Sequence, residues 1–292
     1  MRPLSFNGKA LTRTVDNYWY TGDVLMWIPT TFNNTPSSFV GSYVWHDGND
    51  TYYTDHGTTH KLDVSSKTWS QVDVGLSDYN FFGLNIWHDG NSTYLNLYDG
   101  YHTYVYPFDS TTKKFGTRIL QDYDYPIGDY VWTDGINVYL SMNNGVPGDV
   151  ADNMVWNRST GKWEPKIWYF NPAMQNPLGL MGNAVWKYNG HIYEGDWDNN
   201  GNFIRLYKLN TSTSTWVDTP WDGYCAVEGY KIWLDYEGNM YYSNGDKQYY
   251  MDNSTGKWMP HGEWKMLAQP DGHYVWTDGR EIYHNGNYVL KR

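Results

Sequence analysis

Residues 43–48 read Tyr-Val-Trp-His-Asp-Gly, and residues 274–279 repeat this pattern as Tyr-Val-Trp-Thr-Asp-Gly. A Trp that follows Val or Ile and precedes a Gly-containing tight turn occurs six times along the chain. The six tryptophans are Trp45, Trp87, Trp132, Trp186, Trp233 and Trp276. Successive tryptophans lie 42, 45, 54, 47 and 43 residues apart. A repeat of this length is typical of β-propeller blades rather than of helical arrays.

Three turn signals divide each repeat into four short strands. The first is an Asp-Gly or Asn-Gly pair, such as Asp47-Gly48, which suits the tight turn of a β-hairpin. The second is another Gly turn, such as His56-Gly57. The third is an Asp or Asn followed by Ser or Thr, with an aromatic residue six positions on, as from Asp63 to Trp69. Four antiparallel strands per repeat are therefore expected, which is the composition of one blade.

The last repeat lacks its fourth strand, because the chain ends soon after Tyr288-Val289-Leu290. Trp27 lies 18 residues before Trp45, a step within the 17 to 23 residues found elsewhere between a fourth-strand aromatic and the next repeat. We therefore expect the segment around Val24 to Ile28 to complete the last blade. The alternative is that Trp27 belongs to a leader segment.

The fold expected on this basis is all-β. It is a six-bladed β-propeller of four-stranded antiparallel blades, whose ring is closed by an N-terminal strand. Residues 17–292 form the propeller, and residues 1–16 form an N-terminal arm that docks on a neighbour.

Composition excludes several classes of partner. The net charge is −11, whereas nucleic-acid binding depends on clustered Lys and Arg, so we expect no nucleic-acid partner. A single cysteine, Cys225, allows no internal disulfide. No apolar run has the length of a secretion signal or a membrane span, so no membrane association is expected. Phage virion proteins are made without such signals and leave the cell by lysis.

The repeats resemble the kelch family, and in particular its phage and bacterial members. The motifs that carry the resemblance are YVWTDG, a Tyr near the start of the third strand, and an Asx, Ser or Thr, and Trp at the fourth strand. The resemblance covers residues 18–292, with a single Gly after the second strand where kelch blades typically carry two. It implies a propeller fold, and functions that range from binding scaffolds to oxidases and epimerases, so the fold alone does not select one.

Nearly all of the variation in connection length falls on one face of the expected ring. They are the second-to-third-strand and blade-to-blade connections, above all residues 141–157, 167–183 and 194–205. Aromatic side chains on such loops suit a sugar face or a protein partner. The candidate binding residues are Phe81, Phe82, Tyr123, Tyr125, Trp168, Tyr169, Phe170, Met174 and Trp197. The alternative for each is that it packs between blades.

A metal site is a weaker candidate. Asp196, Asp198 and Asn200 resemble the start of a Ca²⁺ loop, but Ile204 and Tyr207 occupy the later ligand positions. We therefore expect no metal and no cofactor. An enzyme would need two carboxylates, or a carboxylate and a His, that converge in one pocket. The acids to inspect are Asp129, Asp149, Asp152, Glu194 and Glu228.

The function expected is that of a non-enzymatic binding or assembly propeller in a phage virion, associated with the tail or capsid. Its expected partners are other virion proteins or host surface glycan, and homo-oligomers within a symmetric particle are compatible with this role. One alternative is a glycan-binding lectin that is secreted or lies on a bacterial surface. The other is a glycan-active or sugar-isomerising enzyme with its site at the channel mouth.

Overall fold

The structure is a computed structural model, and it describes most of the chain. The described ranges are residues 26–76, 79–99, 101–122, 130–141, 153–171, 184–197, 203–219, 231–244, 247–261 and 271–291, together with the backbone of residues 5–6, 9–10, 12–13 and 19–20. Within them, the side chains of residues 170–171, 196–197, 203–205 and 247 are not described. None of the helical segments in these ranges has both the length and the apolar character that a bilayer crossing requires.

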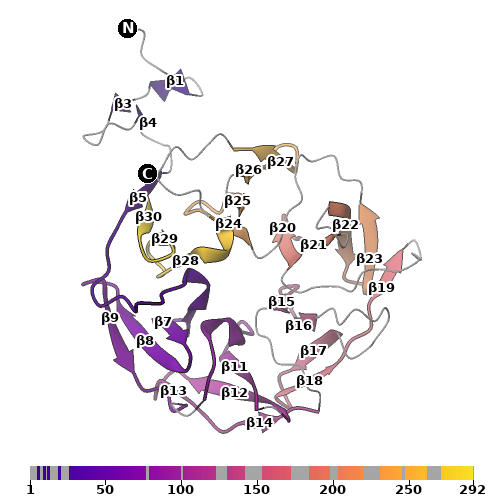
Figure 1. Ribbon diagram of the computed structural model, residues 1–292. Helices are drawn as coiled ribbons and strands as arrows, with labels where there is room; N and C mark the ends of the chain where they lie inside the picture. Colours follow the sequence, from indigo (N-terminus) through magenta and orange to yellow (C-terminus); the bar gives the residue numbers. More distant parts are fainter. Residues whose placement is uncertain are drawn as a thin grey trace.

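Six antiparallel sheets follow one another around a central channel, as the blades of a six-bladed β-propeller (Figure 1). Blade A contains β6 (Val44–His46), β7 (Thr51–Asp55), β8 (Thr58–Asp63) and β9 (Thr68–Val72); blade B contains β10 (Ile86–His88), β11 (Thr93–Tyr98), β12 (Thr103–Asp109), β13 (Lys114–Phe115) and β14 (Ile119–Leu120); blade C contains β15 (Val131–Thr133), β16 (Val138–Ser141), β17 (Asn153–Asn157) and β18 (Lys162–Pro165). Blade D contains β20 (Val185–Tyr188), β21 (His191–Trp197), β22 (Phe203–Asn210) and β23 (Thr215–Thr219); blade E contains β24 (Ile232–Leu234), β25 (Met240–Asn244), β26 (Lys247–Asp252) and β27 (Lys257–Pro260); blade F contains β28 (Val275–Thr277), β29 (Ile282–His284), β30 (Tyr288–Lys291) and β5 (Met26–Pro29). The all-β, six-bladed prediction is confirmed.

The ring is closed by the two ends of the chain. Strand β5 pairs antiparallel with β30, with Leu290 opposite Trp27 (Figure 1). The Trp27 side chain is buried and its ring lies 5.5 Å from that of Trp233 in blade E. The predicted closure is confirmed, with a strand at Met26–Pro29 rather than Val24 to Ile28, and the leader interpretation of Trp27 is wrong.

The described backbone before β5 forms two short hairpins. They consist of β1 (Ser5–Phe6) paired with β2 (Lys9–Ala10), and β3 (Thr12–Arg13) paired with β4 (Trp19–Tyr20). The docking role of the arm stays a prediction.

The Asp of each Asp-Gly pair organises the loop between the first two strands of its blade. The Asp47 carboxylate accepts the backbone N–H groups of Asn49 at 2.9 Å and Asp50 at 2.7 Å. Gly48 has φ +93°, a conformation that Gly adopts without strain. Equivalent carboxylates at Asp89, Asp134 and Asp278 accept the corresponding N–H groups of their own loops.

These loops are longer than the two-residue turns that Asp-Gly pairs predict. His46 pairs with Thr51, which leaves four loop residues between them. The Asp side chain satisfies the extra N–H groups and so stabilises the longer loop. Among the described hairpins between the first and second strands, the two-residue turn occurs only in blade D. There Asn189 has φ 48° and Gly190 has φ 75°.

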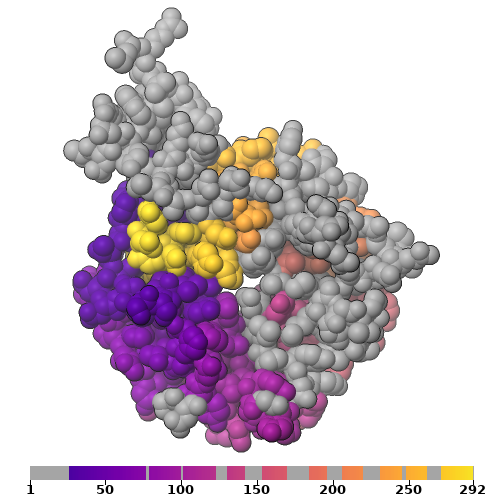
Figure 2. All heavy atoms as spheres, viewed as in Figure 1, coloured from indigo at the N-terminus to yellow at the C-terminus, as the bar shows by residue number. Residues whose placement is uncertain are grey.

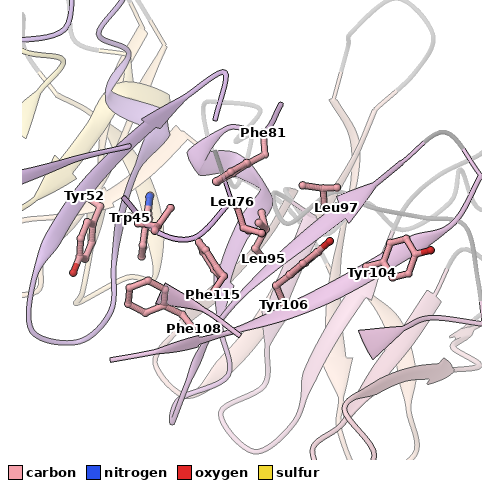
Figure 3. Packing of buried hydrophobic residues seen from close by; sticks show 11 residues of the cluster. Trp45, Tyr52, Leu76, Phe81, Leu95, Leu97, Tyr104, Tyr106, Phe108 and Phe115 are labelled. Atoms are coloured by element: carbon pink, nitrogen blue, oxygen red, sulfur yellow. The ribbon is translucent and has the colours of Figure 1, made fainter. Parts of the chain in front are cut away.

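The repeated Trp residues form the contacts between blades. In blade A, Trp45 stacks on Tyr52 at 4.3 Å and meets Phe108 of blade B edge-on at 5.3 Å. Figure 3 shows Trp45 and Tyr52 facing Phe108 and Phe115 across this junction. Each of the six first-strand tryptophans is 5–7% exposed, so burial of these rings supplies a large share of the apolar stabilisation.

Most of these rings are held in orientation by a hydrogen bond within their own blade. The indole Nε1 of Trp87 donates to the Asn96 amide oxygen at 2.9 Å, and the tryptophans of blades A, C and E donate to Thr54, Ser141 and Ser243. Blade D has Gly195 at the equivalent position. The buried Trp186 Nε1 accordingly has no hydrogen-bond partner among the described residues.

Three described glycines, each four residues before a first-strand Trp, pack against the preceding blade. An added Cβ at Gly83 would lie 1.9 Å from the Tyr43 carbonyl oxygen, and one at Gly272 would lie 1.8 Å from that of Lys231. At Gly41 the corresponding distance to the Tyr274 carbonyl oxygen is 2.3 Å. The first strands of adjacent blades can therefore approach this closely only where the side chain is a hydrogen atom.

Candidate functional site

The inner strands of five blades enclose a cavity of ≈ 590 Å³ at the centre of the ring. The space-filling view shows the opening near the middle of the molecule (Figure 2). Apolar lining side chains include Val44, Val131, Val185, Ile232 and Val275. Polar lining side chains are Ser42, His46, Thr133, Lys187, His273 and Thr277. The described lining contains no carboxylate, so this part of the wall does not present the pair of acids that glycoside hydrolysis requires.

His46, which directly follows the Trp of the first repeat, is a structural group of the first hairpin. Burial lowers the pKa of His46, although the Thr277 backbone and the Asp278 and Asp47 carboxylates oppose the shift. Its Nδ1 atom lies 3.2 Å from the Thr51 hydroxyl. Among the residues for which side chains are described, no group of three His, Cys, Asp or Glu could hold a metal ion.

The buried hairpin carboxylates link neighbouring blades. Asp89 is 4% exposed and accepts from the Arg158 guanidinium of blade C at 2.9 Å. Burial would raise the pKa of Asp89, but hydrogen bonds from the loop N–H groups and from Arg158 outweigh burial and hold it below its ordinary value. Asp47 is paired in the same way with Lys113 of blade B at 2.8 Å. These acids are engaged in holding blades together.

Two of the predicted binding residues, Phe81 and Trp168, pack between blades. Phe81 is 1% exposed and meets Phe115 edge-on at 6.1 Å, because the connection from blade A to blade B folds inward over the first strands. Trp168 lies 5.5 Å from Trp132 and 6.0 Å from Trp216, partly buried against the core between blades C and D. Phe81 is therefore buried and Trp168 partly buried, and a role of either in binding stays a prediction.

The segment after Trp168 forms an additional strand, which the sequence patterns did not predict. Strand β19 (Tyr169–Asn171) pairs in parallel with β23 at the outer edge of blade D (Figure 1). The Tyr169 side chain is 60% exposed there. Phe82 is half-buried and lies 5.2 Å from Tyr43 and 4.7 Å from His56.

Several candidates lie outside what the structure describes. They are residues Tyr123, Tyr125, Met174, Asp198, Asn200, Asp129, Asp149, Asp152 and Glu228, and the side chains of Phe170, Asp196 and Trp197. Glu194 is described, and its side chain is buried on β21 and does not line the central cavity.

An exposed surface at the second hairpin of blade B was missed by sequence reasoning. We define the blade B tyrosine patch as Tyr98 and Tyr101, the exposed tyrosines of this hairpin. Tyr101 is 80% exposed and Tyr98 is 47% exposed. Because second-to-third-strand hairpins and blade-to-blade connections share one face, Tyr98 and Tyr101 lie on the face where binding was predicted. The signal available in the sequence was Tyr98-Asp99-Gly100-Tyr101, in which two aromatic residues flank a tight turn.

The turn that carries Tyr101 is held in place by its own side chain. The Asp99 carboxylate accepts the N–H of Tyr101 at 3.0 Å and that of His102 at 2.9 Å, and these hydrogen bonds lower the pKa of Asp99. Strands β11 and β12 pair directly below, with Tyr98 opposite Thr103. Tyr101 therefore projects from a turn that is fixed at both ends.

Solved structures with a similar fold include one with a TM-score above 0.5. The chain is similar to an extracellular domain of a B. thetaiotaomicron protein, with a TM-score of 0.51 and 13% identity over 97% of this chain and 38% of that one. A second structure of that domain has a TM-score of 0.48, with 12% identity over 91% of this chain and 40% of that one. A Bacteroides fragilis protein has a TM-score of 0.44, with 12% identity over 81% and 76%.

The chain therefore spans 38–40% of the length of the first two structures. No protein-family model matches it, and no curated protein matches it. At 13% identity, the first of these similarities shows a shared propeller architecture and nothing about activity.

Proposed function

We propose that this chain is a non-catalytic binding propeller of a phage particle, and that the blade B tyrosine patch binds a host surface glycan. The observation that carries the proposal is the exposure of Tyr101, at 80%, on a turn whose backbone is fixed by Asp99. A large exposed ring on a rigid support binds a partner at low entropic cost, because few rotatable bonds are frozen.

The chemistry of the described polar groups supports binding rather than catalysis. The buried hairpin carboxylates Asp47 and Asp89 are engaged by loop N–H groups and by cations of the next blade. The described wall of the central cavity presents no acid. The exposed tyrosines of the patch offer apolar faces with a polar hydroxyl, which matches the faces and hydroxyl groups of a sugar.

Attachment to the particle is assigned to the rest of the molecule. In this proposal, the residues before β5 contact other virion proteins, and several copies of the chain are arranged by the symmetry of the particle. The chain would then expose the patch to the host surface while the arm holds it in place.

The test is a glycan array followed by calorimetry on the best ligand, with Tyr101→Ala and Tyr169→Ala compared. Tyr169 is the matched control, because it is also an exposed tyrosine and belongs to the blade D surface predicted from sequence. We expect Tyr101→Ala to weaken binding by about tenfold or more, and Tyr169→Ala to leave it unchanged. Loss of binding in Tyr169→Ala alone would place the site on blade D and contradict the proposal.

A glycan-binding lectin that is secreted or lies on a bacterial surface is the second candidate. It is favoured by the similarity, over 97% of this chain, to a domain described as extracellular. Isolation from the native source separates the two proposals. Copurification with particles supports the virion role, whereas recovery from the cell surface or medium of uninfected bacteria supports the lectin. Turnover of any glycan by the purified protein would instead support an enzyme.

A further inference from the structure

We infer that blade A carries a second binding site, separate from the blade B tyrosine patch, in which the His56 imidazole accepts a hydrogen bond from a hydroxyl group of a neutral sugar. This inference rests on the proposed glycan-binding function and adds a site to it. It is carried by a series of contacts that joins His56 to Asp55 on one side and to Phe82 on the other.

His56 lies at the tip of the second hairpin of blade A, between β7 and β8, where it has φ 47° and Gly57 has φ 78°. Asn or Asp stands at the equivalent turn position of the other blades, as Asp99, Asn144, Asn200, Asn244 and Asn285. In blade F, the Asn285 side chain accepts the Gly41 N–H at 2.9 Å and so supports the next connection. The His56 ring bonds to Asp55 instead. Blade A therefore carries an imidazole where the other blades carry turn-forming residues, and this ring has a different partner.

The Asp55 carboxylate fixes the position of the proton on the His56 ring. His56 Nδ1 lies 2.7 Å from Asp55 Oδ1. An ionised carboxylate only accepts, so Nδ1 carries the proton, and in the neutral ring Nε2 is an acceptor. The other Asp55 oxygen accepts the Ser38 hydroxyl. The Asp55 side chain is 15% exposed and that of His56 is 69% exposed, so a mostly covered carboxylate orients a mostly exposed ring.

Aromatic rings flank His56 on its other side. The Phe82 ring meets the imidazole edge-on at 4.7 Å and lies 5.2 Å from the Tyr43 ring. Phe82 and Tyr43 are both half-buried, so part of each side chain stays exposed. The backbone joins the same two segments, because the Gly57 N–H donates to the Phe81 carbonyl at 2.8 Å. The hairpin and the connection to blade B therefore form one continuous surface, and Phe82 is among the binding residues predicted from the sequence.

The charge of this surface favours a neutral ligand. Asp55 places a negative charge beside the imidazole in a chain of net charge −11, which disfavours an anion. Each Asp55 oxygen already accepts from Ser38 or His56, so the carboxylate orients the ring rather than binding an ammonium group. The groups left for a ligand are the Nε2 acceptor and the aromatic rings beside it. A neutral sugar offers the two complementary features, hydroxyl donors and an apolar C–H face.

The order of the contacts differs from that of a Ser-His-Asp triad. In a triad, the His lies between the other two residues and removes the proton of the nucleophile. Here Asp55 lies between Ser38 and His56, so the serine hydroxyl donates to the carboxylate and no base activates it. This arrangement supports binding by His56 rather than nucleophilic catalysis by Ser38.

The experiment observes binding at the His56 ring itself. The probes are a panel of neutral hexose oligosaccharides, each used unmodified and after O-methylation of its hydroxyl groups. NMR follows the ring nitrogens of the whole chain prepared with isotopically labelled histidine, and calorimetry measures affinity. The variants are His56→Asn, Asp55→Ala and Asp55→Asn, with His191→Asn as the control. His191 is an exposed histidine in the first hairpin of blade D, on the opposite face.

We expect at least one unmodified oligosaccharide to shift the His56 Nε2 signal, and O-methylation to abolish the shift, because no hydroxyl donor remains. His56→Asn should weaken binding at this site by about threefold to tenfold. It should leave the melting temperature unchanged, because Asn occupies the equivalent turn position in four other blades. The control should bind as the unmodified chain does.

Asp55 is a positioning residue, and its variants test that role. Asp55→Ala should move the ring proton of His56 from Nδ1 to Nε2 and weaken binding as His56→Asn does. Asp55→Asn keeps an acceptor oxygen and should restore part of the binding. A purely structural role of Asp55 would leave the ring proton on Nδ1, and that result would contradict the inference.

The Tyr101→Ala variant separates this site from the blade B tyrosine patch. Glycan binding that is lost in Tyr101→Ala and produces no shift at His56 would overturn the inference and leave the proposed function in place. A shift at His56, with full binding by Tyr101→Ala, would support the inference and overturn the patch. No shift, together with an empty glycan array, would overturn both. Equal shifts from the O-methylated probes would contradict the acceptor role of Nε2, and turnover of a probe would contradict a binding role.

Discussion

Replacement of Gly83 by alanine tests how the blades are held around the channel. Gly83 begins the 3₁₀ turn η2 (Gly83–Asn85) and packs against the first strand of blade A. A methyl group there would lie 1.9 Å from the Tyr43 carbonyl oxygen, 2.4 Å from its carbonyl carbon and 2.7 Å from its Cα atom. All three atoms are backbone, so no side chain can rotate away to make room.

The magnitude follows from the displacement that the methyl group requires. An ordinary carbon-to-oxygen contact of about 3.3 Å would need the two blades to separate by roughly 1.4 Å at this point. Overpacking of this kind costs about 3 kcal/mol. Alanine also restricts the unfolded chain, which returns about 0.4–1 kcal/mol. We expect a net loss of about 2 kcal/mol or more, and a melting temperature lower by roughly 4 °C or more.

The measurement is urea denaturation followed by tryptophan fluorescence, with thermal melting as a second probe. Gly116→Ala is the matched control in the same blade, since an added Cβ there lies 3.5 Å from its nearest neighbour and the residue is exposed. The control should change the free energy of unfolding by no more than about 0.5 kcal/mol. Equal stability of the Gly83→Ala and Gly116→Ala proteins would refute the argument that these glycines set the distance between blades.

Three further predictions concern the contacts inside and between blades. Trp27→Ala should cost about 3–5 kcal/mol, because it removes the ring that joins β5 to Trp233; an unchanged unfolding midpoint would contradict this closure. Asn96→Ala should cost about 1–3 kcal/mol by leaving the buried Trp87 Nε1 without its acceptor, and native protein with normal stability would argue against that role. The folded-state pKa of Asp89 lies below its ordinary value, so its carboxylate stabilises the fold above about pH 4 and this contribution is lost as the pH falls through the folded-state pKa. Asp89→Asn should therefore be less stable at neutral pH and show a shallower loss of stability on acidification; an identical pH profile in denaturation experiments would contradict the assignment.

The architecture was predictable because it depends on local signals that repeat. Each repeat contains its own turn residues and its own Trp, and the strand missing after Leu290 is supplied by Trp27 at the correct spacing. One repeating signal was overlooked. A glycine stands four residues before each of the six tryptophans: Gly41, Gly83, Gly128, Gly182, Gly229 and Gly272. At Gly41, Gly83 and Gly272 the reason is a carbonyl group of the neighbouring blade, and only the tertiary structure shows it.

The candidate site was less predictable, because exposure is decided by how a connection folds back on the ring. Phe81 and Trp168 lie in connections that the sequence marks as loops, yet both pack between blades. Tyr101 lies in a short hairpin, and no binding role was predicted for it from the sequence. Its side chain is nevertheless 80% exposed. All three are aromatic residues in predicted connections, and the position of the neighbouring blades decides which ring is covered and which is exposed.

The order of the strands, the number of blades and the closure of the ring follow from the sequence, because hairpin turns and a period of about 45 residues act over short distances along the chain. The tertiary structure decided which aromatic rings are buried and which carboxylates are paired with the next blade. A β-bulge in blade B illustrates this division: Phe115 pairs with Phe108 and Ile119 with Val105, so three residues of the fourth strand lie opposite Tyr106 and Pro107. The missing N–H of Pro107 is visible in the sequence, but its effect depends on the strand that lies beside it.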